Sequence, residues 1–308
     1  MSKKRLYRYP LYLLLRALEW LSVHLPRPVV LAFMGGLAKF VWRVLPKERK
    51  KVLAHLRLAF EGAKTEEEIQ DLGEKVFQNL AWTAVDALRA PLYKQKHLTE
   101  QLIRIEPDVF KKIDEALSKG KGLICLTGHI GNWELITLSV LGFGDYRGGV
   151  IGRKIYYEPF NQVLEKIRIA CNAKIFYRED PVKDVLKSLR KNEVIGILPD
   201  QDVDSIEGEF INFFGTPAYT PTGPAKLSIA SGAPILPVFM LREKNKYRFV
   251  ARDLIWPEIK TTKEEASAQM TKEWSLVVED VIRQYPEQWV WMHRRWKTQP
   301  NIEKVSSA

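Results

Sequence analysis

Cysteine is scarce in this chain, whose 308 residues include only Cys125 and Cys171. Two thiols cannot build a disulfide framework or a cysteine-rich zinc site, so a reducing compartment is the simplest interpretation. The sequence also lacks a Gly-rich Walker loop, a G-x-G-x-x-G turn, a G-x-S-x-G nucleophile elbow and an H-E-x-x-H pair. Metal chemistry and covalent serine chemistry therefore have no support in the sequence, and we expect no metal and no cofactor.

Long uninterrupted apolar runs are missing as well. The mean hydropathy of −0.21 excludes a polytopic membrane protein, although 46% of the residues are apolar and can form a sizeable core. The apolar segment near the N-terminus contains Arg16 and Glu19, and no small-residue cleavage site follows it, so we expect no cleaved signal peptide. A spanning helix needs about 20 mostly apolar residues, which this segment does not provide.

Acidic residues are scarce only at the N-terminal end. The chain has 48 Lys and Arg against 37 Asp and Glu, a net charge of +11, and residues 1–60 hold thirteen of the basic residues but only two acids. Residues 61–308 are therefore neutral. A nucleic-acid enzyme usually spreads basic charge over its binding cleft. The observed distribution instead indicates a segment that attaches to an anionic membrane, with no nucleic-acid partner.

The pattern of the first 60 residues predicts two amphipathic helices separated by Pro26 and Pro28. Leucines line one face of the first helix, at Leu11, Leu14, Leu15, Leu18 and Leu21. The second helix covers residues 29–45 and is interrupted by Lys39 and Arg43. Such helices can lie in the membrane interface with their basic residues facing the headgroups. Two alternatives stay open: both helices could pack on the domain core, or residues 29–45 could form a single tilted span.

From residue 107 the sequence alternates between amphipathic segments and short apolar runs. Buried strands are expected at 122–127, 149–152, 174–177, 194–198 and 235–241, with helices between them at 132–141, 161–172, 182–191 and 222–231. Further helices are expected at 47–60, 65–89, 107–118 and 263–285. The alternation predicts an α/β sheet with helices on both faces. We therefore divide the chain into a membrane-attachment segment, residues 1–60, and an α/β domain, residues 61–308.

One segment combines the residue types of a catalytic site. The sequence GHIGNWE, residues 128–134, directly follows the expected strand at 122–127, and α/β sheets place their sites at the carboxyl ends of strands. With His129 in the turn and Glu134 in the first helical turn, the two side chains can face each other, and Asn132 can cap the helix. A carboxylate beside an imidazole prepares it to accept a proton from a hydroxyl. The alternative is a loop histidine followed by an unrelated glutamate at a helix start.

The His129-x4-Glu134 pattern after a buried strand resembles the signature of the glycerolipid acyltransferase superfamily. Residues 107–297 resemble one branch more closely, the late or secondary lipid A acyltransferases. The matching segments are, in order, GHIGNWE at 128–134, GRK at 152–154, ILPDQD at 197–202, FFGTP at 213–217, GAPILPV at 232–238 and PEQWVWMHRRWK at 286–297. The basic and apolar N-terminus is also typical of that family, so the resemblance covers nearly the whole chain.

The resemblance implies a glycerol-3-phosphate acyltransferase-like fold and an O-acyltransferase at the cytoplasmic face of a bacterial inner membrane. It implies that His129 is the general base, that Glu134 orients it, and that it deprotonates a hydroxyl of a lipid A precursor. That hydroxyl attacks the thioester of an acyl carrier protein or coenzyme A donor, without an acyl-enzyme or a metal. Two other functions stay open: transfer to another glycolipid or aminolipid, and a non-catalytic membrane-binding role.

Further substrate-binding residues are predicted near the same sheet edge. Arg153 and Lys154 follow the strand at 149–152 and are expected to bind phosphate, with solvated charges as the alternative. Asp200 follows the strand at 194–198, where it could hold Arg153 or a sugar hydroxyl. The superfamily has a P-E-G motif near this point, whereas this chain has P-D-Q. Asn132 is also counted among the substrate contacts.

The C-terminal segment WVWMHRRWK, residues 289–297, combines three tryptophans with Arg294 and Arg295. Tryptophan and arginine together suit a membrane interface or a phosphorylated headgroup, and both arginines are expected to bind the substrate. A platform for single-stranded nucleic acid uses the same residue types, but the neutral charge of the main domain argues against it. Core tryptophans with a basic rim are the alternative. Phe213 and Phe214 could likewise line an acyl channel or pack in the core.

Overall fold

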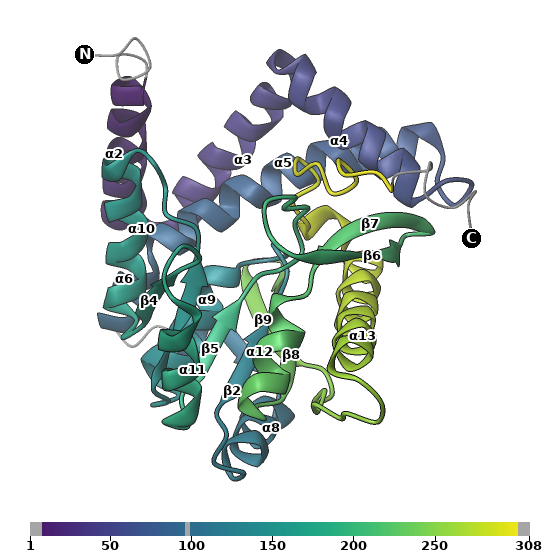
Figure 1. The fold of residues 1–308 in the computed structure, drawn as a ribbon. Helices are drawn as coiled ribbons and strands as arrows, with labels where there is room; N and C mark the ends of the chain where they lie inside the picture. The colour runs from purple at the N-terminus through teal and green to yellow at the C-terminus, as the bar shows by residue number, and fades with distance from the viewer. Residues whose placement is uncertain (1–7, 96–98, 301–308) are drawn as a thin grey trace.

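The structure, a computed structural model, describes residues 8–95 and 99–300. A seven-stranded sheet with the order β1-β9-β8-β2-β5-β3-β4 lies at its centre, flanked by helices (Figure 1). Every pairing is parallel except that of β8 with β9. This mostly parallel sheet confirms the predicted α/β class. The strands are β1 (Ile103–Ile105), β2 (Leu123–Leu126), β3 (Gly148–Gly152), β4 (Lys174–Tyr177), β5 (Val194–Ile197), β8 (Ile235–Glu243) and β9 (Lys246–Ala251).

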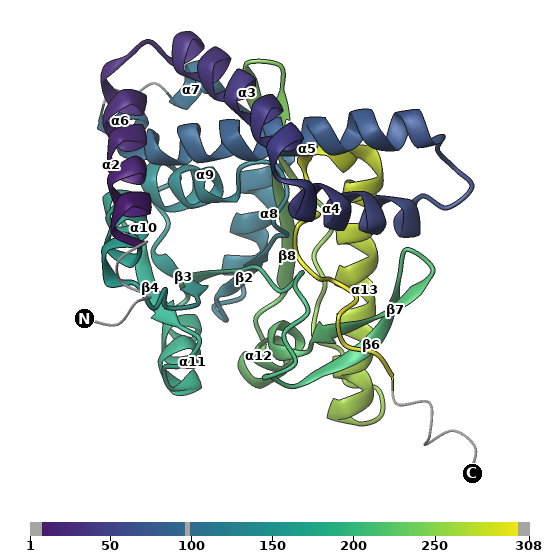
Figure 2. The same ribbon diagram turned by 90° about the horizontal axis from the view of Figure 1, so that it is seen from above.

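The sheet is buried on both faces, because alternate residues of its strands enter different hydrophobic clusters. In β2, Leu123 and Cys125 pack with α8 (Asp108–Leu117) and α10 (Glu158–Ala170). The intervening Ile124 and Leu126 pack instead with α11 (Val182–Arg190), α12 (Gly223–Ser231) and α13 (Lys263–Gln284). Figure 2 shows α8 and α9 on one side of the strands and α11 and α12 on the other. Burial on both faces explains why the strands are continuous apolar runs.

Four N-terminal helices precede the sheet: α2 (Arg8–His24), α3 (Arg27–Val44), α4 (Pro46–Ala59) and α5 (Glu66–Leu88). Figure 1 shows α2 along one side of the molecule and the other three across the top. A capping box begins α5, because the Thr65 side chain accepts from the Glu68 N–H while the Glu68 carboxylate accepts from the Thr65 N–H. Val52 and Leu56 of α4 pack in the same cluster as the α13 face of the sheet. The division of the chain at residue 60 stays a prediction.

The remaining elements are short. They are α6 (Ala90–Gln95), α7 (Thr99–Leu102), α9 (Trp133–Thr137), a π-helix (Leu138–Phe143), the antiparallel hairpin β6 (Gly208–Phe213) and β7 (Thr216–Pro221), and a 3-10 helix (Pro286–Gln288). The helix expected at 132–141 is therefore a short α-helix that continues as a π-helix. The hairpin and strands β1 and β9 were not expected from the sequence.

Exposed apolar side chains are concentrated at the N-terminal end. Of the nineteen large hydrophobic side chains that are exposed in the described residues, twelve lie between Tyr9 and Leu45. Five of them are three or four residues apart on α3 and so share one helical face, here called the α3 apolar stripe: Val29, Phe33, Leu37, Phe40 and Val44. Among the described residues no single helix is long and apolar enough to cross a membrane, and α3 and α4 meet that requirement only as a pair bent by 92°.

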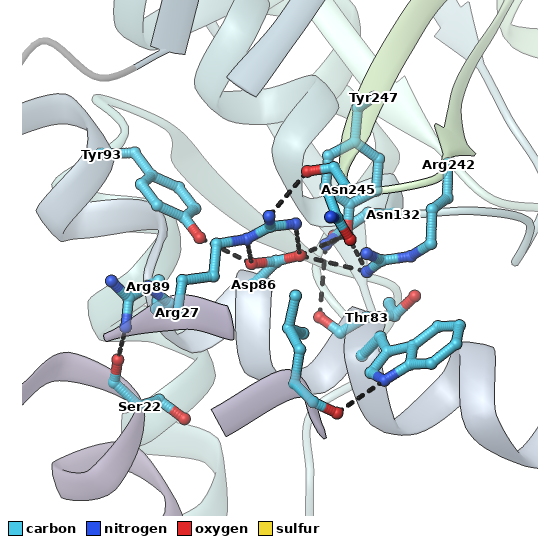
Figure 3. Close-up of polar contacts among 12 residues, drawn as sticks. Ser22, Arg27, Thr83, Asp86, Arg89, Tyr93, Asn132, Arg242, Asn245 and Tyr247 are labelled. Carbon is cyan, nitrogen blue, oxygen red and sulfur yellow. Dashed lines mark hydrogen bonds and ion pairs between the residues drawn. The ribbon is translucent and has the colours of Figure 1, made fainter. Parts of the chain in front are cut away.

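A buried ionic cluster joins the N-terminal helices to the sheet (Figure 3). Asp86 of α5 is completely buried and accepts hydrogen bonds from Arg27 of α3 at 2.7 and 2.9 Å. It also accepts from Tyr93 of α6 at 2.6 Å, from Tyr247 of β9 at 2.7 Å and from Arg242 of β8 at 3.1 Å. Burial by itself would raise the pKa of Asp86, but the two guanidinium groups outweigh it and hold that pKa below its usual value.

Candidate active site

The turn that follows β2 is fixed by its backbone contacts. Gly131 has φ +62°, and a Cβ atom there would lie 2.0 Å from the carbonyl oxygen of Met240, so only glycine fits. The Gly131 N–H donates to the carbonyl of Gln288 at 3.0 Å, and the Asn132 N–H donates to that of Met240 at 2.9 Å. Thr83 of α5 donates from its hydroxyl to the Gly131 carbonyl at 2.9 Å. The turn therefore holds His129 at the carboxyl edge of the sheet.

His129 is oriented by Asp200. The Nδ1 atom of the imidazole lies 2.7 Å from Oδ1 of Asp200, and the backbone N–H of His129 donates to Oδ2 at 2.7 Å. An ionised carboxylate only accepts hydrogen bonds, so Nδ1 bears a proton and the lone pair of a neutral ring is on Nε2. The two residues occupy equivalent places after neighbouring strands, because Leu126 pairs with Ile197 and each site residue follows three positions later. The sequence placed both at this edge, and the structure brings them into contact.

The carboxylate of Asp200 is kept ionised although its side chain is only 1% exposed. Burial by itself would raise the pKa of Asp200, but the charge of His129 and the hydrogen bonds from His129 and Trp289 hold that pKa well below its usual range. The Trp289 indole N–H donates to Oδ2 at 2.9 Å. Both oxygens thus accept hydrogen bonds from within the fold, and none of these bonds comes from Arg153. The structure thus places Asp200 against His129 and Trp289, and its predicted contact with the substrate stays a prediction.

Glu134 does not make the contact that the sequence pattern predicted. Its carboxylate, which is 7% exposed, is paired with the guanidinium of Arg168 on α10 at 2.7 and 3.1 Å. Gly152 leaves room for this pair, since a Cβ atom there would lie 2.9 Å from Nη1 of Arg168. The reason for the difference is geometric: Glu134 lies in the first turn of α9 and faces α10, whereas the His129 ring faces the loop after β5. Sequence proximity therefore indicated the wrong carboxylate for Nδ1.

A large cavity of about 1340 Å³ opens beside these residues. His129, Glu134 and Arg168 lie on its wall together with Gln201 and Arg153. Most of the lining is apolar and falls into two groups of side chains, one on α2, α5 and α10 and the other on α11, α12 and the loops after β5 and β7. The first group includes Leu15, Leu80 and Val163, and the second includes Val185, Pro199 and Leu227. The cavity can therefore hold long apolar groups next to an imidazole and several cations.

The predicted phosphate-binding pair is exposed. Arg153 lies on the cavity wall, and its guanidinium is 5.4 Å from the ring centroid of Tyr156. Lys154 is also exposed, and its ammonium lies 5.7 Å from the ring centroid of Tyr177. Both cations can reach an anionic group, and Arg153 does so from within the cavity.

Two other residues that were predicted to contact the substrate lie inside the fold. Asn132 is fully buried and donates to the Thr83 carbonyl and the Tyr247 hydroxyl, each at 3.3 Å. Its side chain therefore connects the turn to α5 and β9. It is the residue before α9, but its side chain does not cap the helix. Arg295 is 1% exposed and donates to the Tyr219 carbonyl and the Thr220 hydroxyl at 2.6 Å. Its side chain is thus used inside the fold, whereas Arg294 is exposed.

The C-terminal tryptophans belong to the core. Trp289, Trp291 and Trp296 are at most 7% exposed and pack with Phe213 and Phe214 in one cluster. Of the interpretations above, the structure confirms the core alternative for all five aromatic side chains. Burial lowers the pKa of Arg295, beside this cluster, to about 10, so it stays protonated at neutral pH. Its positive charge lies near Asp200 and helps to keep that carboxylate ionised.

Three residues of the site were not singled out in the sequence. Arg168 lies within an expected helix, where one basic residue is no signal. Gln201 and His293 lie in two of the matching segments, and the amide nitrogen of Gln201 is within 3.2 Å of both imidazole rings. The only available signal was their position in those segments. Among the described residues no group of three or more His, Cys, Asp or Glu could hold a metal ion.

Comparisons of the sequence with known proteins show the family of the chain. The sequence profile of the bacterial lipid A biosynthesis acyltransferases matches residues 1–298. The lipid A biosynthesis lauroyltransferase of Escherichia coli K12 is 28% identical over 91% of this chain and 89% of its own length. The lipid A biosynthesis palmitoleoyltransferase of the same organism is also 28% identical, with the same coverage. A phosphatidylinositol mannoside acyltransferase of Mycobacterium tuberculosis is 24% identical over 68% of this chain and 66% of its own length.

Proposed function

The chain belongs to the bacterial lipid A biosynthesis acyltransferase family and is an acyltransferase, and we propose that it moves a fatty acyl chain from a thioester to a hydroxyl of a lipid A precursor. The donor is acyl carrier protein or coenzyme A bearing that chain. The observation that most supports this reaction is the His129–Asp200 pair on the wall of a large apolar cavity. No metal, cofactor or acyl-enzyme takes part in the proposed reaction.

His129 acts as the general base in this proposal. Its Nε2 atom takes the proton of the acceptor hydroxyl, and the oxygen attacks the thioester carbonyl carbon. The C–S bond then breaks, and the leaving thiolate takes the proton from His129. Asp200 holds the Nδ1 proton throughout, so it fixes the tautomer and stabilises the imidazolium that forms. Asp200 has here the orienting role that the sequence pattern suggested for Glu134.

The cations of the cavity have two proposed roles. Glu134 pairs with the guanidinium of Arg168 and so orients it at the wall, where its N–H groups can donate to an oxygen that becomes negative during transfer. Arg153 and Lys154 bind a phosphate of the acceptor or of the donor arm. Exposed Arg294 is a further candidate for a substrate phosphate. The apolar lining holds the acyl chains, since burial stabilises each methylene by about 0.8 kcal/mol.

The location of the enzyme is proposed from the N-terminal helices. The α3 apolar stripe lies in the segment that contains the whole charge excess of the chain. Basic residues beside an exposed apolar helix face suit the interface of an anionic bilayer. Leu15 of α2 lines the cavity, so the helices that contact lipid also reach the site. This supports attachment at a membrane surface, where a lipid acceptor can enter the cavity directly. The cytoplasmic face of the inner membrane is the location that the family resemblance implies.

Replacing Phe33 and Phe40 together with glutamate is expected to weaken binding of the full chain to anionic vesicles by about 100-fold or more, because each buried aromatic side chain contributes roughly 1.5–3 kcal/mol. Both are strongly exposed in the structure, at 62% and 58%. Co-sedimentation with phosphatidylglycerol vesicles measures the effect. The matched control is Leu276→Glu on α13, an apolar side chain with 49% exposure away from the stripe. Equal binding by the double variant and the control would overturn the attachment proposal.

The activity is tested directly with the purified protein. Incubation with a lipid A precursor and an acyl thioester should give a product heavier by one acyl group, detected by mass spectrometry. Deleting the gene should remove the same acyl group from the lipid A of the cell. Acylation of a different glycolipid, with lipid A unchanged in the deletion strain, would overturn the proposed acceptor. Absence of transfer to any lipid would overturn the acyl-transfer mechanism itself.

A further inference from the structure

The side-chain amide of Gln201 lies between two imidazole rings. Its Nε2 atom is 2.7 Å from Nε2 of His293 and 3.1 Å from Nε2 of His129. It is also 3.2 Å from Nδ1 of His129. Nearly equal distances to both ring nitrogens mean that the amide lies against the ring and not in line with the Nε2 lone pair. An incoming hydroxyl can therefore approach that lone pair while the amide stays in place.

His293 accepts a hydrogen bond from this amide. Burial, and then the charge of His129, lower the pKa of His293 to about 4, so its ring is neutral at neutral pH. A neutral ring nitrogen that faces an amide N–H accepts its hydrogen. A carboxamide nitrogen has two hydrogens, so one remains when His293 has taken the other. Gln201 and His129 both line the cavity, whereas His293 is not among its described lining residues. The remaining amide hydrogen of Gln201 therefore belongs to a side chain that borders the space for the substrate.

Three backbone N–H groups of this turn, of a kind that often stabilises an oxyanion, already donate within the fold. The His129 N–H donates to Asp200 at 2.7 Å. The N–H groups of Gly131 and Asn132 donate to the carbonyls of Gln288 and Met240 at 3.0 and 2.9 Å. These three N–H groups therefore stabilise the conformation of the turn and are not free to bind the substrate. A side chain that borders His129 can supply a donor for the reacting oxygen in their place.

We propose that Gln201 donates a hydrogen bond to the oxyanion of the transfer reaction and that His293 positions it, an inference that rests on the acyl transfer proposed above. When the hydroxyl oxygen attacks, its proton goes to His129 and the electron pair of the C=O bond moves to the carbonyl oxygen. Re-formation of the C=O bond expels the thiolate, which takes that proton. The hydroxyl that His129 deprotonates attacks a carbonyl carbon, so this carbonyl must be held close to Nε2 of His129. The amide N–H of Gln201, whose nitrogen is 3.1 Å from that atom, lies in the same place.

Gln201→Ala and Gln201→Glu test the donor. Loss of one such hydrogen bond typically lowers kcat by about 10²–10³-fold, and KM should stay within about threefold because the bond strengthens only as charge develops. Gln201→Glu keeps the side-chain volume but places a carboxylate beside the oxyanion, so its kcat should be at least as low. The control is Gln284→Ala, which removes an exposed glutamine of α13. A kcat within threefold of wild type in Gln201→Ala, or a loss confined to KM, would overturn the proposal.

His293 is tested as a positioning residue by two variants. His293→Gln supplies an acceptor oxygen and should keep kcat within about tenfold of wild type, whereas His293→Phe keeps the ring volume without an acceptor and should approach the loss in Gln201→Ala. Because both residues act through one hydrogen bond, the double variant Gln201→Ala/His293→Phe should be little worse than Gln201→Ala alone. Losses that add would overturn the positioning role. A wild-type enzyme that fails to transfer would instead refute the proposed function, so the two failures are distinguishable.

Discussion

Replacing His129 with alanine should lower kcat for acyl transfer by about 10²–10⁴-fold, the usual contribution of a positioned general base. The protein should stay folded, because the side chain is 21% exposed on the wall of an existing cavity. Kinetics with a purified lipid A precursor and an acyl thioester measure the loss, and the urea midpoint of unfolding shows whether the fold is retained. Activity close to that of wild type in a folded variant would overturn the mechanism.

The structure makes a sharper distinction between the two carboxylates of the site. Asp200→Asn keeps the shape but turns a hydrogen-bond acceptor of Nδ1–H into an amide, so the ring loses its orientation and kcat should fall nearly as far as in His129→Ala. Glu134→Gln should leave the His129 tautomer intact because Glu134 pairs with Arg168. Proton NMR distinguishes the two: the downfield Nδ1–H resonance should persist in Glu134→Gln and disappear in Asp200→Asn. The opposite result would return the orienting role to Glu134.

The sequence predicted the fold well where burial is two-sided. Strands such as β2 and β5 are apolar on both faces, so four or five residues were enough to identify them. Strand β9 has the sequence KYRFVA and the hairpin strand β6 has GEFINF, and in both the polar residues interrupt the apolar pattern. Their positions are set by pairing with β8 and with β7. Local pattern does not contain that information.

The sequence predicted the location of the site more accurately than the contacts between its side chains. His129 and Asp200 were both expected at the carboxyl edge because each follows a buried strand. Their direct contact depends on the pairing of Leu126 with Ile197, a relation between strands that one sequence does not provide. Arg295 was interpreted as a substrate ligand because arginine beside tryptophan suits a phosphorylated headgroup. Its burial depends on the carbonyl of Tyr219 and the hydroxyl of Thr220, which come from the hairpin that the sequence did not predict.

Asp86→Asn should lower the free energy of unfolding at pH 7 by about 3–5 kcal/mol, because removing one partner of a buried ion pair leaves the others uncompensated. Arg27 and Arg242 would each keep a desolvated charge without its carboxylate. Urea denaturation of the purified protein measures the change. The matched control is Asp71→Asn on the same helix, whose side chain is 62% exposed and paired with Lys75. An exposed pair of this kind contributes about 0.2–1 kcal/mol, so the control should change little.

The pH dependence of this difference tests whether charge is its cause. The folded-state pKa of Asp86 is below the usual value, so its ionised form stabilises the protein above the unfolded pKa of about 3.9, and this contribution is lost as the pH falls through the lower folded pKa. The gap between wild type and Asp86→Asn should therefore be full at pH 7 and shrink below about pH 4. A gap that stays constant in acid would indicate lost packing instead of lost charge. Asp86 contacts Tyr247, which in turn contacts Asn132 of the catalytic turn. If Asp86→Asn lowered the free energy of unfolding no more than Asp71→Asn does, the buried cluster would not stabilise the packing of α3 on the sheet or on this turn.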